Sequence, residues 1–408
     1  MAEPKTITVV DMGSTKVVSL VGEASAEVDG LFTIIGVGMA STRGVRRGQI
    51  INVAEATESI RESLTGAEAS SGIKSATVLM SISGNHIASQ NSQGAVAIGR
   101  GDQGVTLDDI NHALESAQAI TVPNNREILH VIPRHFRLDD QDGVRNPVGM
   151  LGYRLEVQTH IITCATTAAQ NLLKCAHTAG VDVSEFVLAP LASAEAVLTP
   201  TEREMGAVVV DIGGGVTGIA VFIEGAAWHT KVLDVGSQHF TSDLAQVLQL
   251  PMETAEQFKV TYGHASPLDV PGDQIVEMTG FGDEPRVRVM RREAAEIVRA
   301  RADELFNLIE TEIKRSGYDG LLPAGLVMTG GGSLLPGLRE SARETTKRPV
   351  RLAHPANLQG LVDSLQSPAY SAAAGMLHWG MQGIAARPSK RRRGPRDLPG
   401  WLKNLLPN

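Results

Sequence analysis

The chain has 408 residues, of which 42% are hydrophobic, enough for two or more cores of ordinary domain size. Its two cysteines have neither disulfide-framework nor metal-binding spacing, and no run of eighteen apolar residues could span a bilayer, so a disulfide scaffold, a zinc domain and a transmembrane helix are not expected. The net charge of −8 combines +6 in residues 387–408 (seven Lys or Arg, one acid) with −14 elsewhere, and such an acidic body argues against a general nucleic-acid binder.

The chain opens on a predicted β-hairpin in residues 6–21, TITVVDMGSTKVVSLV. Because this strand comes almost at once, we expect no secretion signal. Asp11 lies at the end of the first strand, and the turn contains Gly13, Ser14, Thr15 and Lys16. A glycine turn lets backbone N–H groups approach an anion, and the hydroxyls and the ammonium group could reach phosphate oxygens. The alternative is that these are only polar turn residues.

Residues 84–163 contain several strand-like runs and one amphipathic helix near 107–120. On that helix Leu107, Ile110 and Leu114 are expected to lie on one apolar stripe. The pattern predicts a compact α/β subdomain inserted into the first lobe.

A second hairpin is predicted in residues 207–222, AVVVDIGGGVTGIAVF, where Asp211 precedes Gly213, Gly214 and Gly215. The run after the glycines is β-branched, which distinguishes it from a Walker loop or a dinucleotide motif, since both of these open a helix. It matches the first hairpin 200 residues earlier, with a turn expected to be one residue longer, and this predicts an internal duplication into two related α/β lobes. Two such hairpins facing each other could clamp a polyphosphate, while Asp11 and Asp211 hold Mg²⁺ through water.

Two further segments could complete a nucleotide site. In 325–338, GLVMTGGGSLLPGL, a strand ends in Gly330, Gly331 and Gly332, and Ser333 is expected to cap a helix beginning near Pro336. This corner could bring backbone close to a flat adenine or ribose. In 253–263, Glu256 and Lys259 lie one helical turn apart and could hold the ribose and a base edge, or form only a surface ion pair.

A charged amphipathic helix is predicted around 291–310. Its apolar stripe comprises Ala295, Val298, Ala302, Leu305 and Ile309. We expect this stripe to pack inward and the charges to face water.

The C-terminal residues combine a flexible basic linker, 387–396, with a short amphipathic helix, 397–408. The helical stripe comprises Leu398, Trp401, Leu402, Leu405 and Leu406. Burying five such side chains yields at most roughly 7–15 kcal/mol, and ordering about ten residues costs roughly 10 kcal/mol. Each Lys or Arg near anionic lipid adds about 1 kcal/mol. One copy should therefore bind a membrane weakly, and several copies on one polymer far more tightly. The alternatives are a disordered basic end or a helix that docks on a protein.

The order of the three glycine corners resembles the phosphate 1, phosphate 2 and adenosine motifs of the actin, Hsp70 and sugar-kinase superfamily. The resemblance implies an α/β fold of two lobes, the actin/Hsp70-like ATPase fold, with ATP and Mg²⁺ in the cleft. Under it the phosphate and adenosine contacts fall to the glycines, Ser14, Thr15, Lys16, Glu256 and Lys259.

A more specific resemblance, to the FtsA family of bacterial division proteins, covers nearly the whole chain. It is carried by STRGVRRGQIIN at 41–52, by ILHVIP and NPVGMLGYRLE within 84–163, by AEQFKVTYG at 255–263 and by SPAYSAAAGMLHWG at 367–380. It divides the chain into lobe 1A (1–83 and 164–203), inserted subdomain 1C (84–163), lobe 2A (204–233 and 310–386), inserted subdomain 2B (234–309), the linker and the terminal helix.

The family resemblance also implies a function. Subdomain 1C would take part in self-association into filaments, and 2B would bind the C-terminal peptide of the ring protein FtsZ, with Arg301 and Glu304 as candidate contacts. The terminal helix would attach the protein peripherally to the cytoplasmic face of the inner membrane, where it binds anionic lipid and anchors the ring at the division site. Downstream division proteins would be recruited there.

Substantial ATP hydrolysis is not expected. In related filaments a carboxylate before a proline orients the attacking water, whereas Ala189 precedes Pro190 here; Glu195, further along, is a possible substitute. Two alternative functions remain. One is a pilus-assembly adaptor of the PilM type, which would share the fold and insertion but is disfavoured by the tail and by NPVGMLGYRLE. The other is a sugar-kinase-like phosphotransferase, for which no substrate-base segment is evident.

Overall fold

A computed structural model describes residues 5–24, 32–99, 104–120, 122–281, 286–361 and 365–385. The predicted linker and terminal helix, including Leu398, Trp401, Leu402, Leu405 and Leu406, lie outside the described residues. Within the described residues, no helix has both the length and the apolar character that crossing a membrane requires.

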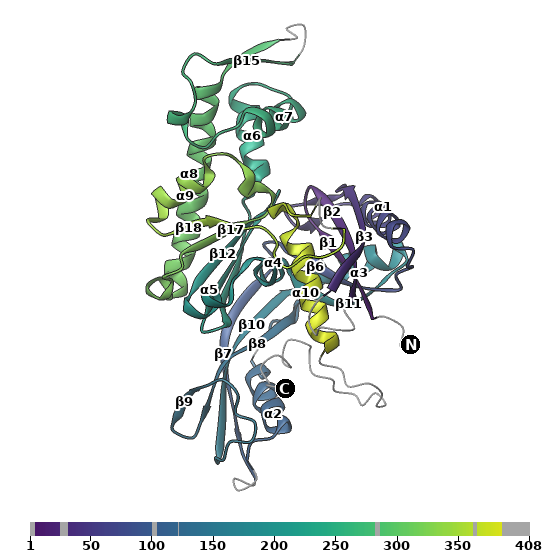
Figure 1. Ribbon diagram of the computed structural model, residues 1–408, viewed down its shortest axis with the longest axis vertical. Coiled ribbons are helices and arrows are strands. Elements are labelled where there is room, and N and C mark those ends of the chain that lie inside the picture. The colour runs from purple at the N-terminus through teal and green to yellow at the C-terminus, as the bar shows by residue number, and fades with distance from the viewer. Residues whose placement is uncertain are drawn as a thin grey trace.

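Two five-stranded sheets of the same topology form the two lobes (Figure 1). The first has the order β11-β6-β1-β2-β3, from β1 (Thr6–Met12), β2 (Lys16–Ala24), β3 (Phe32–Ser41), β6 (Thr77–Ile82) and β11 (Asp182–Leu188). The second has the order β14-β13-β12-β17-β18, from β12 (Ala207–Ile212), β13 (Thr217–Ile223), β14 (Ala226–Leu233), β17 (Leu326–Thr329) and β18 (Val350–Leu352). In each sheet three antiparallel strands are followed by two parallel ones. The duplication predicted from the two Asp–Gly turns is therefore a duplication of the whole sheet.

By the strand bounds the second turn is one residue longer than the first, as predicted: residues 13–15 separate β1 from β2, and residues 213–216 separate β12 from β13. The hydrogen bonds that close the two turns nevertheless correspond. Gly13 N–H donates to the Lys16 carbonyl at 3.1 Å, and Gly213 N–H donates to the Val216 carbonyl at 2.9 Å. The strand pairs flanking the turns also correspond, Met12 with Val17 and Ile212 with Thr217. The two hairpins therefore have the same register, and β2 begins one residue earlier than β13 because Lys16 pairs with Ser41 of β3.

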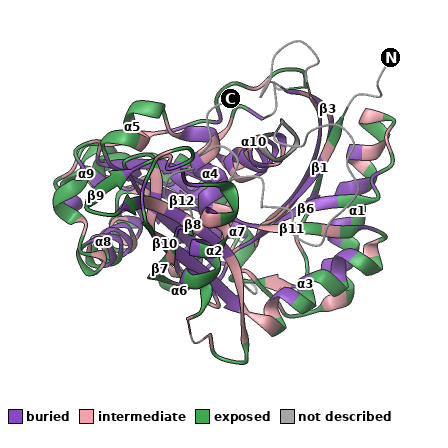
Figure 2. Ribbon diagram, turned by 90° about the horizontal axis from the view of Figure 1, so that it is seen from below, coloured by how far each residue is buried: buried purple, intermediate pink, exposed green. Residues whose placement is uncertain are grey.

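Helices cover the sheets, with exposed outer faces and buried inner faces (Figure 2). They are α1 (Val53–Ser71), α3 (Thr166–Ala179), α4 (Ala189–Val197), α5 (Pro200–Met205), α6 (Ser237–Val247), α7 (Met252–Tyr262), α8 (Arg291–Ser316), α9 (Leu338–Thr346) and α10 (Ser371–Ala385). Two small hairpins accompany them: β4 (Val45–Arg46) with β5 (Gln49–Ile50), and β15 (Ile275–Met278) with β16 (Val287–Met290). All five residues of the predicted 291–310 stripe are buried on α8, which confirms its inward face.

Helix α10 packs against the first lobe, although the predicted boundaries placed residues 371–385 in the second. Its side chains Ala374, Met376 and Leu377 belong to the same core as Val9 and Val18 of the first sheet. Gly375 makes this possible, because a Cβ there would lie 1.6 Å from the Ala192 carbonyl oxygen of α4. The two helices therefore cross with their backbones in close contact at the junction of the lobes.

The inserted subdomain is a four-stranded sheet, β7-β10-β8-β9, with one helix on it. It comprises β7 (Ala88–Ala97), α2 (Leu107–Gln118), β8 (Arg126–Leu138), β9 (Gln141–Val144) and β10 (Arg154–Ala165). Ile110 and Leu114 of α2 are buried as predicted, but Leu107 is 43% exposed. Leu107 is exposed at the first position of the helix, directly after its cap residue Thr106, whose hydroxyl accepts from the Asp109 N–H.

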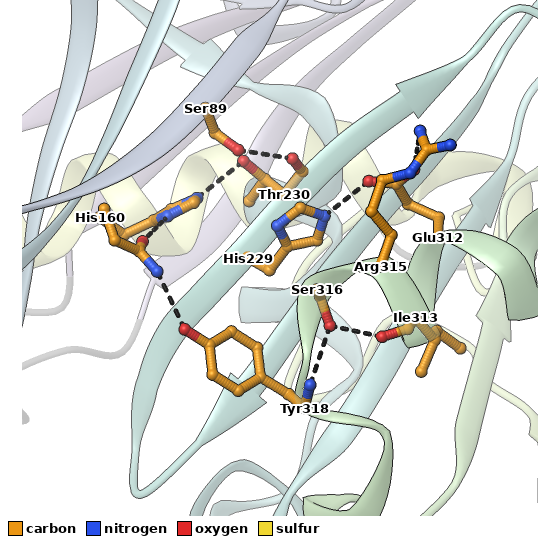
Figure 3. A network of polar contacts seen from close by, with 10 residues as sticks. Ser89, His160, His229, Thr230, Glu312, Ile313, Arg315, Ser316 and Tyr318 are labelled. Carbon is orange, nitrogen blue, oxygen red and sulfur yellow. Dashed lines mark hydrogen bonds and ion pairs between the residues drawn. The ribbon is translucent and has the colours of Figure 1, made fainter.

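The subdomain contacts both lobes through buried histidines. On the second-lobe side, His160 Nε2 lies 3.0 Å from Thr230 Oγ1, and the Ser89 hydroxyl donates to the Thr230 carbonyl (Figure 3). On the first-lobe side, the Leu188 N–H donates to His130 Nε2 at 3.1 Å. The subdomain is thus held by hydrogen bonds to β14 of one lobe and to the end of β11 of the other.

Candidate nucleotide site

A cavity of about 420 Å³ lies between the two lobes, and every residue predicted to contact phosphate, adenosine or metal lines it. These are Asp11, Gly13, Ser14, Thr15, Lys16, Asp211, Gly213, Gly214, Gly215, Glu256, Lys259, Gly330, Gly331 and Gly332. They come from two sheets and from α7, so the structure brings together residues as far as 321 positions apart, Asp11 and Gly332.

The two hairpin turns face each other tip to tip. A Cβ at Gly214 would lie 2.4 Å from Thr15 Cγ2, and one at Gly215 would lie 2.6 Å from Ser14 Oγ. Only glycine therefore allows the second turn to approach the first this closely. Beside them Arg47, in the turn between β4 and β5, forms a 3.0 Å ion pair with Asp234 that joins the lobes at the edge of the cavity.

Asp11 and Asp211 are held at the ends of β1 and β12 by serine hydroxyls. Ser81 Oγ donates to Asp11 Oδ1 at 2.7 Å, and Ser193 Oγ donates to Asp211 Oδ2 at 2.6 Å. Burial raises the pKa of Asp11 above its ordinary value, opposed by the Ser81 hydroxyl and Lys16. Burial likewise raises the pKa of Asp211 from 3.8 to about 6, opposed by Ser193 and reinforced by the carboxylate of Asp11. The two half-buried carboxylates therefore repel each other when both are charged, and a bound cation would reduce this repulsion.

Lys16 lies at the same end of the cavity. Its Nζ is 3.5 Å from the centre of the Tyr370 ring, and burial lowers the pKa of its ammonium group to about 8, with Asp11 opposing. The protein therefore compensates the positive charge of the ammonium group only in part, and the group can bind an anion.

The third glycine corner packs directly behind the second hairpin. Gly330 has a φ of 83°, and a Cβ there would meet Asp211 Oδ1 at 2.4 Å. The expectation that Ser333 caps a helix near Pro336 is wrong. Residues 331–334 form a short 3₁₀ turn, the Ser333 hydroxyl donates back to the Gly330 carbonyl at 2.6 Å, and α9 begins at Leu338. Pro336 and Gly337 lie between the 3₁₀ turn and α9. Local capping rules do not distinguish such a turn from the start of a helix.

Glu256 and Lys259 form an ion pair at 2.7 Å in which the Glu256 side chain is about half exposed and the Lys259 side chain is buried. Lys259 is only 7% exposed, and its Nζ also donates to Thr241 Oγ1 at 2.8 Å and to the Ser237 carbonyl at 3.2 Å. The ammonium group therefore ties α7 to α6, while both residues of the pair line the cavity.

Sequence reasoning missed several residues of this site. Ser81 and Ser193 orient the aspartates, and Pro368 and Ala369 close the cavity beside Gly330. A serine at the end of a neighbouring strand or in a connecting helix has no local signature, because only the parallel pairing of β6 with β1 brings Ser81 to Asp11.

Ala189 and Pro190 line the cavity. Glu195 is not one of its lining residues in the described part of the chain. Its carboxylate accepts from Arg203 at 2.7 Å. The predicted substitute for a water-orienting carboxylate is therefore engaged elsewhere.

Arg301 and Glu304, the predicted partner contacts, are not part of this cavity. They lie on α8, where the Arg301 guanidinium forms two hydrogen bonds to Asp243 of α6, at 2.6 and 2.9 Å, and also contacts Glu304. A carboxylate partner at this surface would compete with Asp243.

Duplicated five-stranded sheets that face each other across a glycine-lined cleft define an actin-like ATPase fold. The same fold occurs in a chain of a PilM–PilN type IV pilus biogenesis complex (TM-score 0.67, 17% identity, 92% of this chain and 98% of that one) and in MreB5 of Spiroplasma citri bound to ADP (TM-score 0.57, 12% identity, 93% and 98%). The chain belongs to the FtsA family of cell division proteins, as its sequence relatives establish. It is 40% identical to the cell division protein FtsA of Pseudomonas aeruginosa over 378 residues (93% of this chain, 90% of that protein) and 35% identical to that of Escherichia coli K12 over 409 residues (98% and 96%).

Two family descriptions match parts of the chain. "Cell division protein FtsA" matches residues 208–375, and "SHS2 domain inserted in FTSA" matches residues 84–163. The second range is the one occupied by the inserted four-stranded subdomain.

Proposed function

We propose that this cell division protein binds ATP with Mg²⁺ in the cleft and uses it as a switch for self-association. The observation that carries this proposal is the convergence of both hairpin turns, both aspartates and the glycine corner on one cavity. In support, the related fold in MreB5 of Spiroplasma citri is described bound to ADP and, in another structure, to AMPPNP.

The residues present fit Mg²⁺ and a polyphosphate. Among the described residues no cluster of three or more His, Cys, Asp or Glu could enclose a metal, so the aspartate pair suits an ion that keeps water and phosphate ligands. Mg²⁺ would supply charge neutralisation for the phosphates. Asp11 and Asp211 would hold its hydration shell, the turn N–H groups and Lys16 would bind phosphate oxygens, and Glu256 and Lys259 would contact ribose or base.

The protein is proposed to be at most a weak ATPase. Ala189 carries no group that could orient a water at its position in the cavity, and Glu195 is paired with Arg203. Bound ATP would therefore persist and hold the two hairpins together as a clamp, favouring contacts between copies of the chain.

The body is proposed to link the FtsZ ring to the membrane. FtsZ would bind with its C-terminal peptide at the α8 surface that carries Arg301 and Glu304, and later division proteins would be recruited to the division site. The terminal helix would insert Leu398, Trp401, Leu402, Leu405 and Leu406 into anionic lipid at the cytoplasmic face of the inner membrane, at the division site. Subdomain 1C would contribute to contacts in the filament.

Sedimentation with anionic vesicles tests the membrane step. The full chain should co-sediment more strongly under conditions of self-association, because each added tail makes an intramolecular contact. Deleting 397–408 should abolish the binding, and a variant with Trp401→Ser and Leu405→Ser should lose most of it while keeping the basic linker. Equal vesicle affinity for monomer and polymer would contradict the proposal. The FtsZ C-terminal peptide should sediment with the vesicles only when the protein carries its intact C-terminal tail.

A further inference from the structure

A second, smaller cavity of about 170 Å³ adjoins the nucleotide cleft. The two cavities share Met12, Gly48, Ser81 and Ser83 as lining residues, so the smaller one begins where the first hairpin and the end of β6 meet. Its other walls come from the β4–β5 hairpin and from the first turns of α3. The cavity therefore extends away from the phosphate end of the cleft, within the first lobe.

The polar side chains that line this cavity carry no negative charge. None of its described lining residues is Asp or Glu, in contrast to the cleft with Asp11 and Asp211. Gln49, Ser83, Thr167 and Asn171 contribute hydroxyl and amide groups. A lining without carboxylates favours an anion over a cation.

His86 supplies an unsatisfied donor in the same cavity. Both of its ring nitrogens are buried from solvent and lack a hydrogen-bond partner among the described residues. The ring packs on Gly84, where a Cβ would lie 2.6 Å from Nδ1, so the chain makes room for the imidazole by omitting a side chain. Buried polar atoms are nearly always paired in folded proteins, so the two imidazole nitrogens are free to bind a molecule that enters the cavity.

The beginning of α3 adds a second set of donors. Its cap residue, Ala165, has no side-chain hydrogen bond to the first turn, and no acidic residue lies in that turn. Thr167 and Ala168 of this turn line the cavity, and their N–H groups have no acceptor within the helix. The positive end of the helix dipole thus points toward the same space as His86.

Arg126 increases the positive field at this position. Its guanidinium donates to the His86 carbonyl at 2.8 Å and to Thr163, and it adds to burial in lowering the pKa of the His86 imidazole to about 4. The ring is therefore neutral near pH 7 with nothing bound, and one of its nitrogens can donate. A bound anion would raise the pKa of the His86 imidazole and so oppose the lowering by burial and by Arg126.

We propose that this cavity is a binding site for a small tetrahedral oxyanion, with inorganic phosphate as its ligand. His86, the α3 N-terminus and the side chains of Ser83 and Asn171 would hold the oxygens. The ion could come from solution or from the terminal phosphate of a nucleotide in the adjoining cleft. The solution route does not depend on the proposed ATP binding.

Titration of the full chain with sodium phosphate, followed by NMR of the His86 imidazole, tests the site. Phosphate should shift the His86 signals saturably and raise the pKa of the ring, whereas sodium chloride at equal ionic strength should not. His86→Phe should weaken phosphate binding about tenfold, the effect of one charge-assisted hydrogen bond. Asn171→Leu should weaken it as well, through a different wall of the cavity.

His86→Phe separates a binding role from a structural one. Replacing a half-buried imidazole whose two nitrogens have no partner by an apolar ring should leave the stability of the protein without phosphate equal or higher. His264→Phe is the matched control, because His264 Nδ1 accepts from the Ser266 N–H at 3.0 Å and is absent from both cavities. It should leave phosphate binding unchanged.

Two arms distinguish the sources of the ion. The first uses the nucleotide-free chain with free phosphate, and the second uses γ-labelled ATP and asks whether labelled phosphate stays bound after ADP has formed. Binding in either arm that His86→Phe removes supports the site. Unshifted His86 signals at millimolar phosphate, or equal phosphate binding by His86→Phe, would overturn it, whatever the result for ATP.

Discussion

Replacing Asp211 by Asn should make the nucleotide-free protein more stable at pH 8, by up to about 3 kcal/mol in the free energy of unfolding. Burial raises the pKa of this carboxyl from 3.8 to about 6, and each pKa unit corresponds to about 1.4 kcal/mol. Because the folded-state pKa lies above the unfolded one, the folded protein loses stability as the pH rises from 4 to 6. Above pH 6 the full cost is present, and Asn, which carries no charge, removes it.

The same substitution should abolish the stabilisation of the protein by ATP and Mg²⁺. The carboxylates of Asp11 and Asp211 oppose each other without a cation, so the site is destabilised in the form that is ready to bind. Urea unfolding at pH 8, with and without ATP and Mg²⁺, measures both effects. Asp140→Asn, at an exposed turn, serves as control and should change neither. A less stable Asp211→Asn protein that still gains stability from ATP and Mg²⁺ would contradict this account of the pair.

The sequence predicted the parts of the cleft that depend on short local patterns. Asp11 and Asp211 could be identified because each ends a β-branched run before a glycine turn, and a strand of that kind is recognised from its own residues alone. The duplicated topology followed from the repeat of that pattern at 200 residues. The predicted cleft residues converge because both hairpins occupy the same position in the two copies of one sheet.

What the sequence did not predict depends on packing between distant segments. The position of α10 on the first lobe rests on the contact of Gly375 with Ala192, which nothing in SAAAGMLHWG indicates. Scattered histidines gave no pattern, yet His130 and His160 are buried at the two contacts of the inserted subdomain. The burial of Lys259 under α6 likewise depends on a helix eighteen residues earlier in the chain, at Thr241.

The two subdomain histidines should make the protein strongly sensitive to acid. Burial lowers the pKa of His130 and of His160 from 6.5 to about 3 in each case. Because these folded-state values lie below the unfolded value, their contribution is complete above pH 6.5 and is lost as the pH falls toward 3. Each histidine should therefore cost the folded state about 2 kcal/mol between pH 7 and pH 5.

Geometry gives an independent reason why His130 stays neutral. Its Nε2 accepts from the Leu188 N–H, and a backbone N–H can only donate, so a proton on Nε2 would remove this bond and place two donors face to face. For His160, Nδ1 lies 2.7 Å from Asn91 Oδ1 and Nε2 faces Thr230 Oγ1, an arrangement that a neutral ring satisfies with one donor and one acceptor (Figure 3).

His130→Gln tests this sensitivity, because the glutamine carbonyl can still accept from Leu188 but takes up no proton. Between pH 7 and pH 5 the variant should lose about 2 kcal/mol less unfolding free energy than the unmodified chain, measured by urea unfolding. Parallel profiles for His130→Gln and the unmodified chain would show that His130 takes up a proton equally in the folded and unfolded states, and would contradict this prediction. Asp211 acts in the opposite direction over this pH range, so the two single variants separate the contributions. His130→Gln should reduce the loss of unfolding free energy between pH 7 and pH 5, and Asp211→Asn should increase it.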